Sequence, residues 1–324
     1  MIRYIGLRLA QAIPLVAVAT FTIFVAVSLA GDPLDRYRAP NVPASTLAAK
    51  AAELGLNQPL TTRYWHWITG VLHGNFGTNA VGGDVRTELI DRSLVSLRLV
   101  TFAIVIAIVL AIVVGFVAAV RQHTFTERGL VALTVILLTA PEFWTAVIVK
   151  QGAITMQQHT GTDFISTVGQ SSPDNAQLGW GARIGDYAGH LLLPTIVLVL
   201  ASYPVWALYQ RAAMLEVIDS DYITLARAKG LGRTRVMVRH GLRNALMPVI
   251  TMIALRLPWI ISGLVVVETI FGWQGLGSML VEGIQKQDTN TVLAFMLLSA
   301  VLITVLNLAA DIAHRFLDPR IRNA

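Results

Sequence analysis

The sequence predicts an all-α fold, a polytopic bundle of six transmembrane helices. Of its 324 residues, 55% are hydrophobic and only 14% are charged, a balance that soluble domains do not normally show. Six apolar stretches are each long enough to cross the hydrocarbon core of a bilayer, which is ~30 Å thick. A single segment satisfies its own backbone there only as a helix, and the stretches lack the period-two alternation of barrel strands.

The segments between these stretches are rich in Gly, Pro, Asn, Asp and charged residues, which indicate loops. The chain thus divides into residues 1–94, with the first span and a long external segment, and residues 95–324, a five-span core with a cytoplasmic loop at 211–246. The predicted spans are residues 9–30, 95–120, 129–150, 189–210, 247–270 and 291–313.

The first apolar stretch has two interpretations. It ends in Ser28-Leu29-Ala30, which resembles a signal-peptidase site. The stretch is longer than the ~7–15 apolar residues of a signal peptide, however, and long enough to cross the membrane. We predict a retained first span, with a cleaved signal peptide as the alternative.

Basic residues flank the spans mainly on one side of a six-span arrangement. The two segments that would lie opposite, 151–188 and 272–290, are acidic or balanced. Cytoplasmic loops carry the excess of Lys and Arg, so we predict a multi-pass protein of the cell membrane with both termini in the cytoplasm. The residues that set this orientation are Arg3, Arg8, Arg121, Arg128, Arg211, Arg227, Lys229, Arg233, Arg235, Arg239, Arg243, Arg315, Arg320 and Arg322.

The net charge of +6 does not indicate nucleic-acid binding, because the basic residues lie at the ends of apolar stretches. No cysteine is present, which excludes thiolate metal sites and cysteine nucleophiles. None of the four lysines follows a glycine, so the chain has no phosphate-binding loop and should not hydrolyse ATP. It also lacks the His-Glu-x-x-His and Gly-x-Ser-x-Gly motifs, which leaves an intramembrane hydrolase as a minor hypothesis. We predict no catalytic residue, cofactor or metal site in this chain.

The external segment contains Trp65, His66 and Trp67 among apolar neighbours, which predicts a small packed element rather than a free linker. The cytoplasmic loop predicts a short helix over 221–230. Ser220 is placed as N-cap, Asp221 lies in the first turn, and Gly230 is placed to end the helix in the left-handed conformation.

On that helix one face would combine apolar and small side chains with a cationic end. Such a ridge suits a groove on another protein, although a plain connector that keeps its basic residues inside is the alternative. The residues of the face are Tyr222, Leu225, Ala226 and Lys229.

The same loop resembles the signature loop of binding-protein-dependent ABC-importer permeases. The matching residues are Tyr222, Ala226, Arg227, Ala228, Lys229, Gly230 and Leu231, then Arg243, Asn244, Ala245, Leu246 and Pro248. Thr224 stands where the broader superfamily has Glu. Further similarity to the B-type permease of dipeptide and oligopeptide importers is found at residues 54–60, 74–78, 265–277, 311 and 317–320, whereas segment 151–188 is longer and more polar than in that family.

This resemblance implies a type I ABC-importer permease that translocates peptides by alternating access. It implies a second homologous permease subunit, two cytoplasmic ATPase subunits that use ATP and Mg, and an extracytoplasmic solute-binding protein. It also implies that the loop forms a coupling helix docked on an ATPase. The coupling residues are then Asp221, Tyr222, Leu225, Ala226, Arg227, Ala228, Lys229 and Gly230.

Two other functions stay open. Related permeases carry nickel, glutathione or other small solutes, and the sequence does not distinguish these cargoes. A carrier or channel that works without ATPases is the alternative from another class, in which the loop would only set topology.

Three charged residues inside or near predicted spans are candidates for the translocation path. Glu142 and Arg256 lie at depths that agree within ~5 Å, and we hypothesise that they pair with each other or line the passage. Snorkelling of one of them to an interface is the alternative. We expect Glu268, at the outer end of the fifth span, to be interfacial and to act in gating or in contact with the solute-delivering protein.

Overall fold

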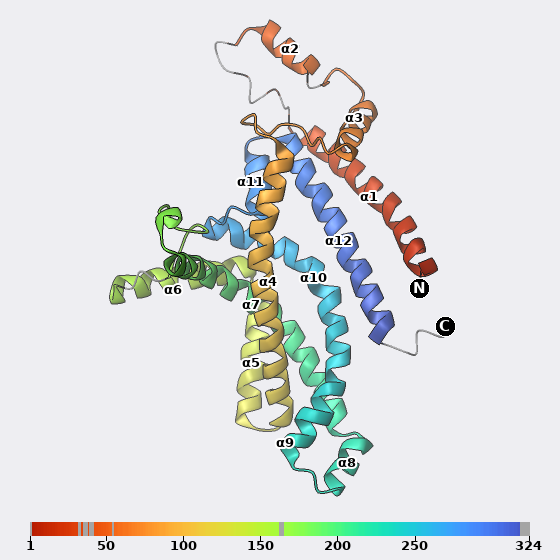
Figure 1. Ribbon diagram of the computed structural model, residues 1–324, viewed down its shortest axis with the longest axis vertical. Helices are drawn as coiled ribbons and strands as arrows, with labels where there is room; N and C mark the ends of the chain where they lie inside the picture. The colour runs from red at the N-terminus through yellow and green to blue at the C-terminus, as the bar shows by residue number, and fades with distance from the viewer. Residues whose placement is uncertain are drawn as a thin grey trace. The chain divides into compact units, whose positions relative to one another are not determined.

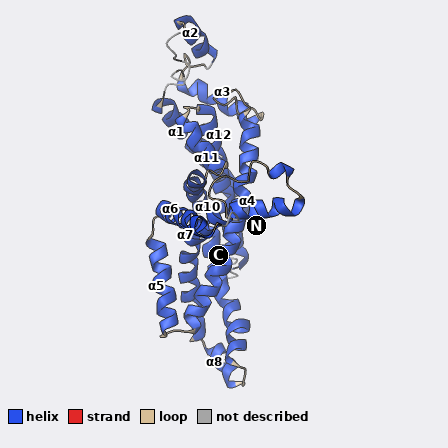
Figure 2. Cartoon of the chain, turned by 90° about the vertical axis from the view of Figure 1, so that its left-hand side faces the viewer, coloured by secondary structure: helices blue, strands red, loops and turns tan. Residues whose placement is uncertain are grey.

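The computed structural model describes residues 2–31, 34, 38, 42–53, 55–161 and 165–317, and these fold into helices (Figures 1 and 2). In this part of the chain the only β-type pairing is an isolated bridge between Thr78 and Asp84. The all-α prediction is therefore confirmed. The predicted motif at residues 318–320 lies outside the described residues.

The helices in chain order are α1 Ile2–Ala30, α2 Ala44–Glu53, α3 Leu60–Leu72, α4 Val85–Val120, α5 Phe125–Thr139, α6 Glu142–Thr160, the 3-10 turn η2 Asn175–Gln177, α7 Trp180–Ile218, α8 Asp221–Ala228, α9 Arg233–Val236, the π-helical turn η3 Met237–Leu242, α10 Arg243–Phe271, α11 Leu276–Gln285 and α12 Thr289–Leu317.

Four of the described helices are long and apolar enough to cross a membrane, namely α4, α7, Ala10–Ala30 of α1 and Thr289–Ala310 of α12. Two further pairs pass the same test together: α5 with α6, and Gly263–Phe271 with α11. When each pair counts as one span, the total is six, as predicted.

The predicted third span, 129–150, is not one straight helix. α5 and α6 meet at an angle of 109° at Ala140 and Pro141. Ala140 is extended, with φ −69° and ψ 127°, because the proline ring disfavours the helical conformation of the preceding residue. Pro141 also lacks the N–H that a continuous helix would need. The prediction of an uninterrupted span is wrong here for this reason, and α6 turns away from α5 (Figure 1).

The described chain divides into two compact units, which do not follow chain order. The first comprises Met1–Ser96 and Gln274–Val305, and the second Leu97–Trp273 and Leu306–Ala324. The sequence analysis assigned residues 95–324 to a single core, whereas Gln274–Val305 belong here to the first unit. The division at residue 94 stays a prediction.

In the first unit, α3 packs on α1 through aromatic side chains. Tyr64 contacts the rings of Phe21 and Phe24 edge-on, and its hydroxyl lies 2.9 Å from the hydroxyl of Thr20. Trp67 lies against Phe24 as well. A packed element is therefore present here, but Tyr64 and Trp67 form it, whereas Trp65 and His66 of the predicted group are exposed.

In the second unit, α4 approaches α7 closely at Gly115 and has further buried small residues. Ala107 and Ala111 are fully buried. A Cβ on Gly115 would lie 2.6 Å from the carbonyl oxygen of Ala207 and from the Cβ of Gln210. Small residues at this spacing let two helix backbones pack tightly in a membrane. α7 stays one helix through both of its prolines and packs on α10 and α5.

Candidate coupling site and passage

The short helix predicted in the loop after α7 is present as α8. It begins at Asp221 and ends at Ala228, within the predicted range 221–230. Gly230 has φ +76°, the left-handed conformation expected of a glycine that ends a helix. The prediction of a separate short helix is confirmed.

One buried side chain anchors α8 to the rest of the second unit. Ile223 is fully buried against Val236 and Met237, and Phe116 and Val120 pack around this cluster. A helix of this length is not stable by itself in water, so its position depends on tertiary contacts. Burying one such apolar side chain contributes about 1.5–3 kcal/mol. The sequence analysis missed Ile223, although an apolar residue off the exposed ridge was the available signal.

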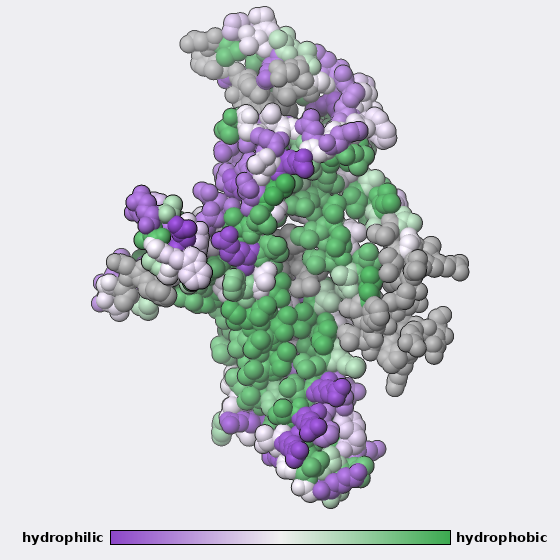
Figure 3. All heavy atoms as spheres, viewed as in Figure 1, coloured by the Kyte–Doolittle hydropathy of each residue, from purple (hydrophilic) through white to green (hydrophobic). Residues whose placement is uncertain are grey.

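The ridge predicted on α8 is largely exposed. Tyr222 is 42% exposed and Leu225 57% exposed, whereas Ala226 is partly buried against the anchoring cluster. Lys229 follows the helix and is also exposed. Polar and charged residues gather around α8 and α9, while apolar residues cover the face formed by α4 and α5 (Figure 3). The exposed apolar ridge of α8 thus lies at the polar end of this unit.

Ser220 occupies the N-cap position, but its hydroxyl does not cap the helix. It donates a hydrogen bond to the carbonyl oxygen of Val217, at 2.6 Å, in the preceding turn of α7. Ser220 therefore ties α8 to the end of α7, and the predicted capping hydrogen bond is wrong.

The chain passes from α8 to α10 through α9 and a π-helical turn, which the sequence analysis did not predict. Gly241 in this turn is buried beside Met214 and Val217 of α7. Arg233 donates a hydrogen bond to the carbonyl oxygen of Val120, at 3.1 Å. π-Helical turns occur frequently at functional sites. Here the turn joins α9 to α10.

Glu142 lies at the start of α6 and contacts α10. A Cβ added to Gly263 would stand 2.6 Å from both carboxylate oxygens of Glu142. Its Oε1 is buried without a hydrogen-bond partner, while the residue as a whole is only half-buried. No ion pair joins Glu142 to Arg256 in the described structure, and the direct-pair form of our hypothesis is wrong because Glu142 faces Gly263 instead.

Arg256 lies seven residues before Gly263 on α10 and is exposed. Charged residues within membrane spans normally face a cavity or a partner. The position of Arg256 leaves the passage-lining form of the hypothesis open.

Glu268 is fully buried inside the second unit, next to the buried Phe271. The expected interfacial position is wrong. α10 ends at Phe271, and the chain turns back so that the N–H of Trp273 bonds to the carbonyl oxygen of Glu268, at 2.8 Å.

Lys150 holds the far end of the α6–α10 contact. Its ammonium donates to the carbonyl oxygen of Ile270, at 2.5 Å, and stands 5.7 Å from the centre of the Phe271 ring. The sequence analysis did not single out this lysine. A lysine within a predicted span was the available signal.

The first unit contains a charged network that joins α4 to α11. Arg92 donates to both oxygens of Glu282, each at 3.1 Å, and forms an ion pair with Glu88 at 2.9 Å. Asp288 accepts hydrogen bonds from the N–H groups of Ala80 and Thr291, which fixes the loop before α4 to the start of α12. The sequence analysis missed this network. The only part that the sequence could have indicated is the pair Glu88 and Arg92, which are four residues apart on one helix.

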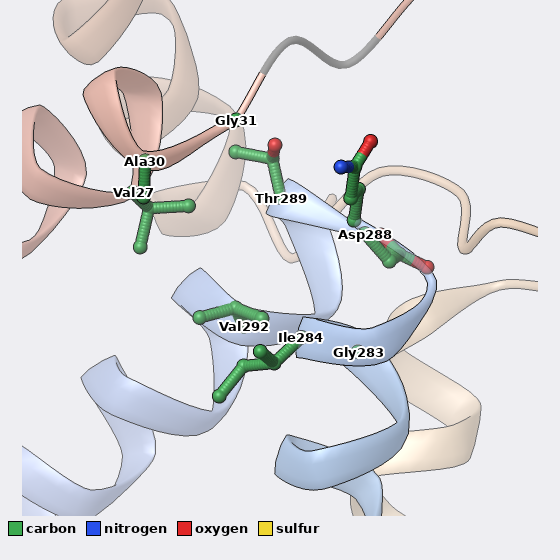
Figure 4. A pocket seen from close by; sticks show the side chains of 9 residues that line it. Val27, Ala30, Gly31, Gly283, Ile284, Asp288, Thr289 and Val292 are labelled. Carbon is green, nitrogen blue, oxygen red and sulfur yellow. The ribbon is translucent and has the colours of Figure 1, made fainter. Parts of the chain in front are cut away.

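A cavity of about 190 Å³ opens beside this loop, between the end of α1 and the α11–α12 turn (Figure 4). Val27, Ala30 and Gly31 line one side, and Ile284 and Val292 the other. Binding sites for small molecules usually measure about 300–1,000 Å³. This cavity is too small to be a cargo site.

Comparison with known proteins identifies the family. Residues 111–323 match the model of the binding-protein-dependent transport system inner membrane component, and residues 1–83 match the model of its N-terminal part. The chain belongs to this family. Membership agrees with the resemblance found at Tyr222–Leu231 and with the several apolar helices.

The curated relatives of this inner membrane component match along their full length. The oligopeptide transport system permease protein OppB of Mycobacterium tuberculosis (strain ATCC 25618 / H37Rv) is 39% identical, with 99% of each chain covered. AppB, the oligopeptide transport system permease protein of Bacillus subtilis (strain 168), is 35% identical, and the glutathione transport system permease protein GsiC of Salmonella typhimurium is 33% identical, both with the same coverage.

Among solved structures, the crystal structure of an amino acid ABC transporter with histidines has a similar fold. The match has a TM-score of 0.53 at 11% identity and covers 71% of this chain and 94% of that one. This similarity supports the type I permease fold. In the described part of the chain, no group of three or more His, Cys, Asp or Glu side chains is arranged to hold a metal ion.

Proposed function

We propose that the chain is one of two membrane-spanning subunits of an ATP-driven importer that translocates peptides across the cell membrane. Its similarity over the full length to oligopeptide permeases, at 39% and 35% identity, supports peptides as the cargo. The chain itself uses no cofactor, and ATP and Mg are used by two cytoplasmic ATPase subunits. A second homologous permease and an extracytoplasmic solute-binding protein complete the importer, with both termini of this chain in the cytoplasm.

The observation that carries the coupling part of this proposal is the exposed ridge on an anchored helix. Ile223 holds α8 in place, and Tyr222 and Leu225 leave an apolar surface uncovered at the polar end of the unit. We propose that this ridge inserts into a groove of an ATPase subunit, together with Lys229. Closure of the ATPases would then move α8, and the movement would reach α10 through α9 and η3.

We propose that Glu142, at the contact of α6 with α10, and Arg256, seven residues before Gly263 on α10, both line the passage. The importer would expose this passage to one side of the membrane and then to the other. Glu268, which is buried, has a structural part in this proposal and no direct contact with the solute-binding protein.

Glutathione is the second candidate cargo. The relative GsiC, at 33% identity over 99% of both chains, supports it. Competition between labelled peptide and glutathione for uptake by the assembled importer decides between the two cargoes.

The coupling proposal is tested by copurification of the chain with its ATPases from native membranes. Leu225→Asp places a charge on the exposed ridge and should remove the ATPases from the eluate. Thr224→Asp is the matched control, because Thr224 is also exposed but lies on the opposite face of α8. Retention of the ATPases by Leu225→Asp, or their equal loss in both variants, would contradict docking through this ridge.

A further inference from the structure

α3 has an apolar face that is largely exposed in the described part of its unit. Trp65 is 66% exposed and Leu72 78% exposed, and Ile68 lies between them in the sequence. Seven residues make almost two full helical turns, so Trp65 and Leu72 point to the same side of the helix, with Ile68 within about 60° of both. Exposed apolar surface that is gathered on one side of an element marks an interaction site.

The other two sides of α3 differ from this apolar face. Tyr64 and Trp67 pack on the aromatic rings of α1. Thr62 and His66, which are one turn apart, are polar and exposed. Successive residues are about 100° apart around a helix, so the side on α1, the apolar face and the polar side follow one another around α3. The part of the helix that α1 does not cover is therefore amphipathic.

The contact with α3 lies inside the part of α1 that can cross a membrane. This part is Ala10–Ala30, and its 21 residues, at about 1.5 Å each, match the ~30 Å of the hydrocarbon core. The Tyr64 hydroxyl lies 2.9 Å from that of Thr20, which is about 15 Å along the axis from Ala30. It also donates to the carbonyl oxygen of Ala17, at 3.3 Å. α3, which lies beside α1 in Figure 1, therefore reaches the depth of the lipid.

We propose that α3 is an interfacial helix of the outer leaflet, with Trp65, Ile68 and Leu72 against lipid acyl chains and His66 toward the headgroups and water. Tryptophan and tyrosine are enriched at membrane–water interfaces, and an amphipathic helix that lies there buries its apolar face about 5–10 Å deep. Part of the segment predicted to be external would then be in contact with lipid.

The position of α3 beside α1 favours lipid over a soluble partner. A water-soluble protein does not reach a surface at the depth of the acyl chains, whereas lipid covers every such surface that protein leaves exposed. The leaflet is the outer one because the chain reaches α3 from the end of α1 opposite its cytoplasmic N-terminus. That choice of leaflet rests on the proposed function, but the contact with lipid does not.

The charge of Arg63 is compatible with this position. Its guanidinium carbon lies 5.8 Å from the centre of the Phe24 ring, an arrangement that stabilises a cation beside apolar surface. A long basic side chain also reaches from apolar surroundings to the headgroups.

The test uses the absence of cysteine from this chain. The variants Trp65→Cys, Leu72→Cys and His66→Cys each carry one nitroxide label in the assembled importer in nanodiscs, with partner subunits that also lack cysteine. Electron paramagnetic resonance measures collisions of the label with oxygen, which concentrates in lipid, and with a water-soluble nickel complex. The ratio of oxygen to nickel collisions should be several times higher at residues 65 and 72 than at residue 66.

His66 is the matched control, because it is also exposed but lies on the polar side of the same helix. Equal ratios at the three positions would overturn the proposal, since α3 would then lie in water. Low collision rates with both reagents at residues 65 and 72 would also overturn it, because protein would cover the face. Loss of oxygen collisions only on addition of the solute-binding protein would assign the face to that protein instead.

Peptide import by the same preparations is a separate readout. Absence of ATP-driven import in the wild type would overturn the proposed function, while a high ratio at residues 65 and 72 would still establish the contact with lipid.

Discussion

The position of α8 should depend on a single side chain, Ile223. Replacing a fully buried isoleucine by alanine costs about 2–5 kcal/mol, and an eight-residue helix has no other large buried anchor in this structure. We expect Ile223→Ala to release α8 locally without unfolding the membrane helices. At the lower end of this range, the opening equilibrium of α8 increases about thirtyfold.

Amide hydrogen exchange of the purified importer measures this opening directly. Exchange over residues 221–230 should become about thirtyfold faster in Ile223→Ala, while the middle of α10 keeps the wild-type rate. Leu225→Ala is the control, because Leu225 is 57% exposed and contributes little to holding the helix. Equal exchange in the two variants, or faster exchange throughout α7 and α10, would refute the anchoring by Ile223.

Three further predictions concern packing, a buried amide and pH. Gly115→Ala forces a Cβ against the backbone carbonyl oxygen of Ala207 and should destabilise the protein by about 1–3 kcal/mol, while Gly152→Ala, with no atom within 4 Å of its Cβ, should not; equal melting temperatures would contradict this. Gln210 is fully buried, and neither of its side-chain polar atoms has a hydrogen-bond partner. Gln210→Met should therefore stabilise the protein by about 1–3 kcal/mol and raise its melting temperature. A lower melting temperature would show that the amide is hydrogen-bonded in the wild type. Asp84 accepts two hydrogen bonds from the first turn of α4, which hold its pKa below the usual value of about 3.9. Ionised Asp84 therefore stabilises that turn fully above about pH 3.9, and this stabilisation is lost as the pH falls through the lowered pKa. In Asp84→Asn, amide exchange at the start of α4 should no longer accelerate at low pH. The same pH profile in wild type and variant would exclude Asp84 as the cause of the acceleration.

Features set by local sequence were the ones that could be predicted. The apolar stretches identify the spans because their length must match the bilayer. Gly230 was placed in the left-handed conformation because glycine adopts it without steric cost, and the structure has φ +76° there. The ridge of α8 followed from helical spacing alone, and its members Tyr222 and Leu225 are exposed.

Features set by the approach of distant segments could not be predicted. Arg92 and Glu282 are 190 residues apart, and no periodicity links them. Glu142 was expected level with Arg256 because their estimated depths agreed, but it contacts Gly263, seven residues further along α10. Burial of Glu268 depends on how neighbouring segments pack around it, which hydropathy does not describe.

The break at Pro141 is an intermediate case. The residue type gave the signal, but proline is also tolerated inside α7, where Pro194 and Pro204 are buried within one continuous helix. Neighbouring helices decide between a break and a continuous helix, because they supply or withhold partners for the freed carbonyls.

The central claim, that ATP hydrolysis by partner subunits drives peptide import through this chain, is tested most directly by uptake into proteoliposomes. The complete importer is reconstituted with its solute-binding protein, labelled peptide is supplied on that side, and ATP is supplied on the other with all ion gradients dissipated. We predict uptake that requires ATP, persists without ion gradients and is abolished by Leu225→Asp but not by Thr224→Asp. Uptake that proceeds without ATP and follows an ion gradient would contradict this account and identify the chain as a carrier.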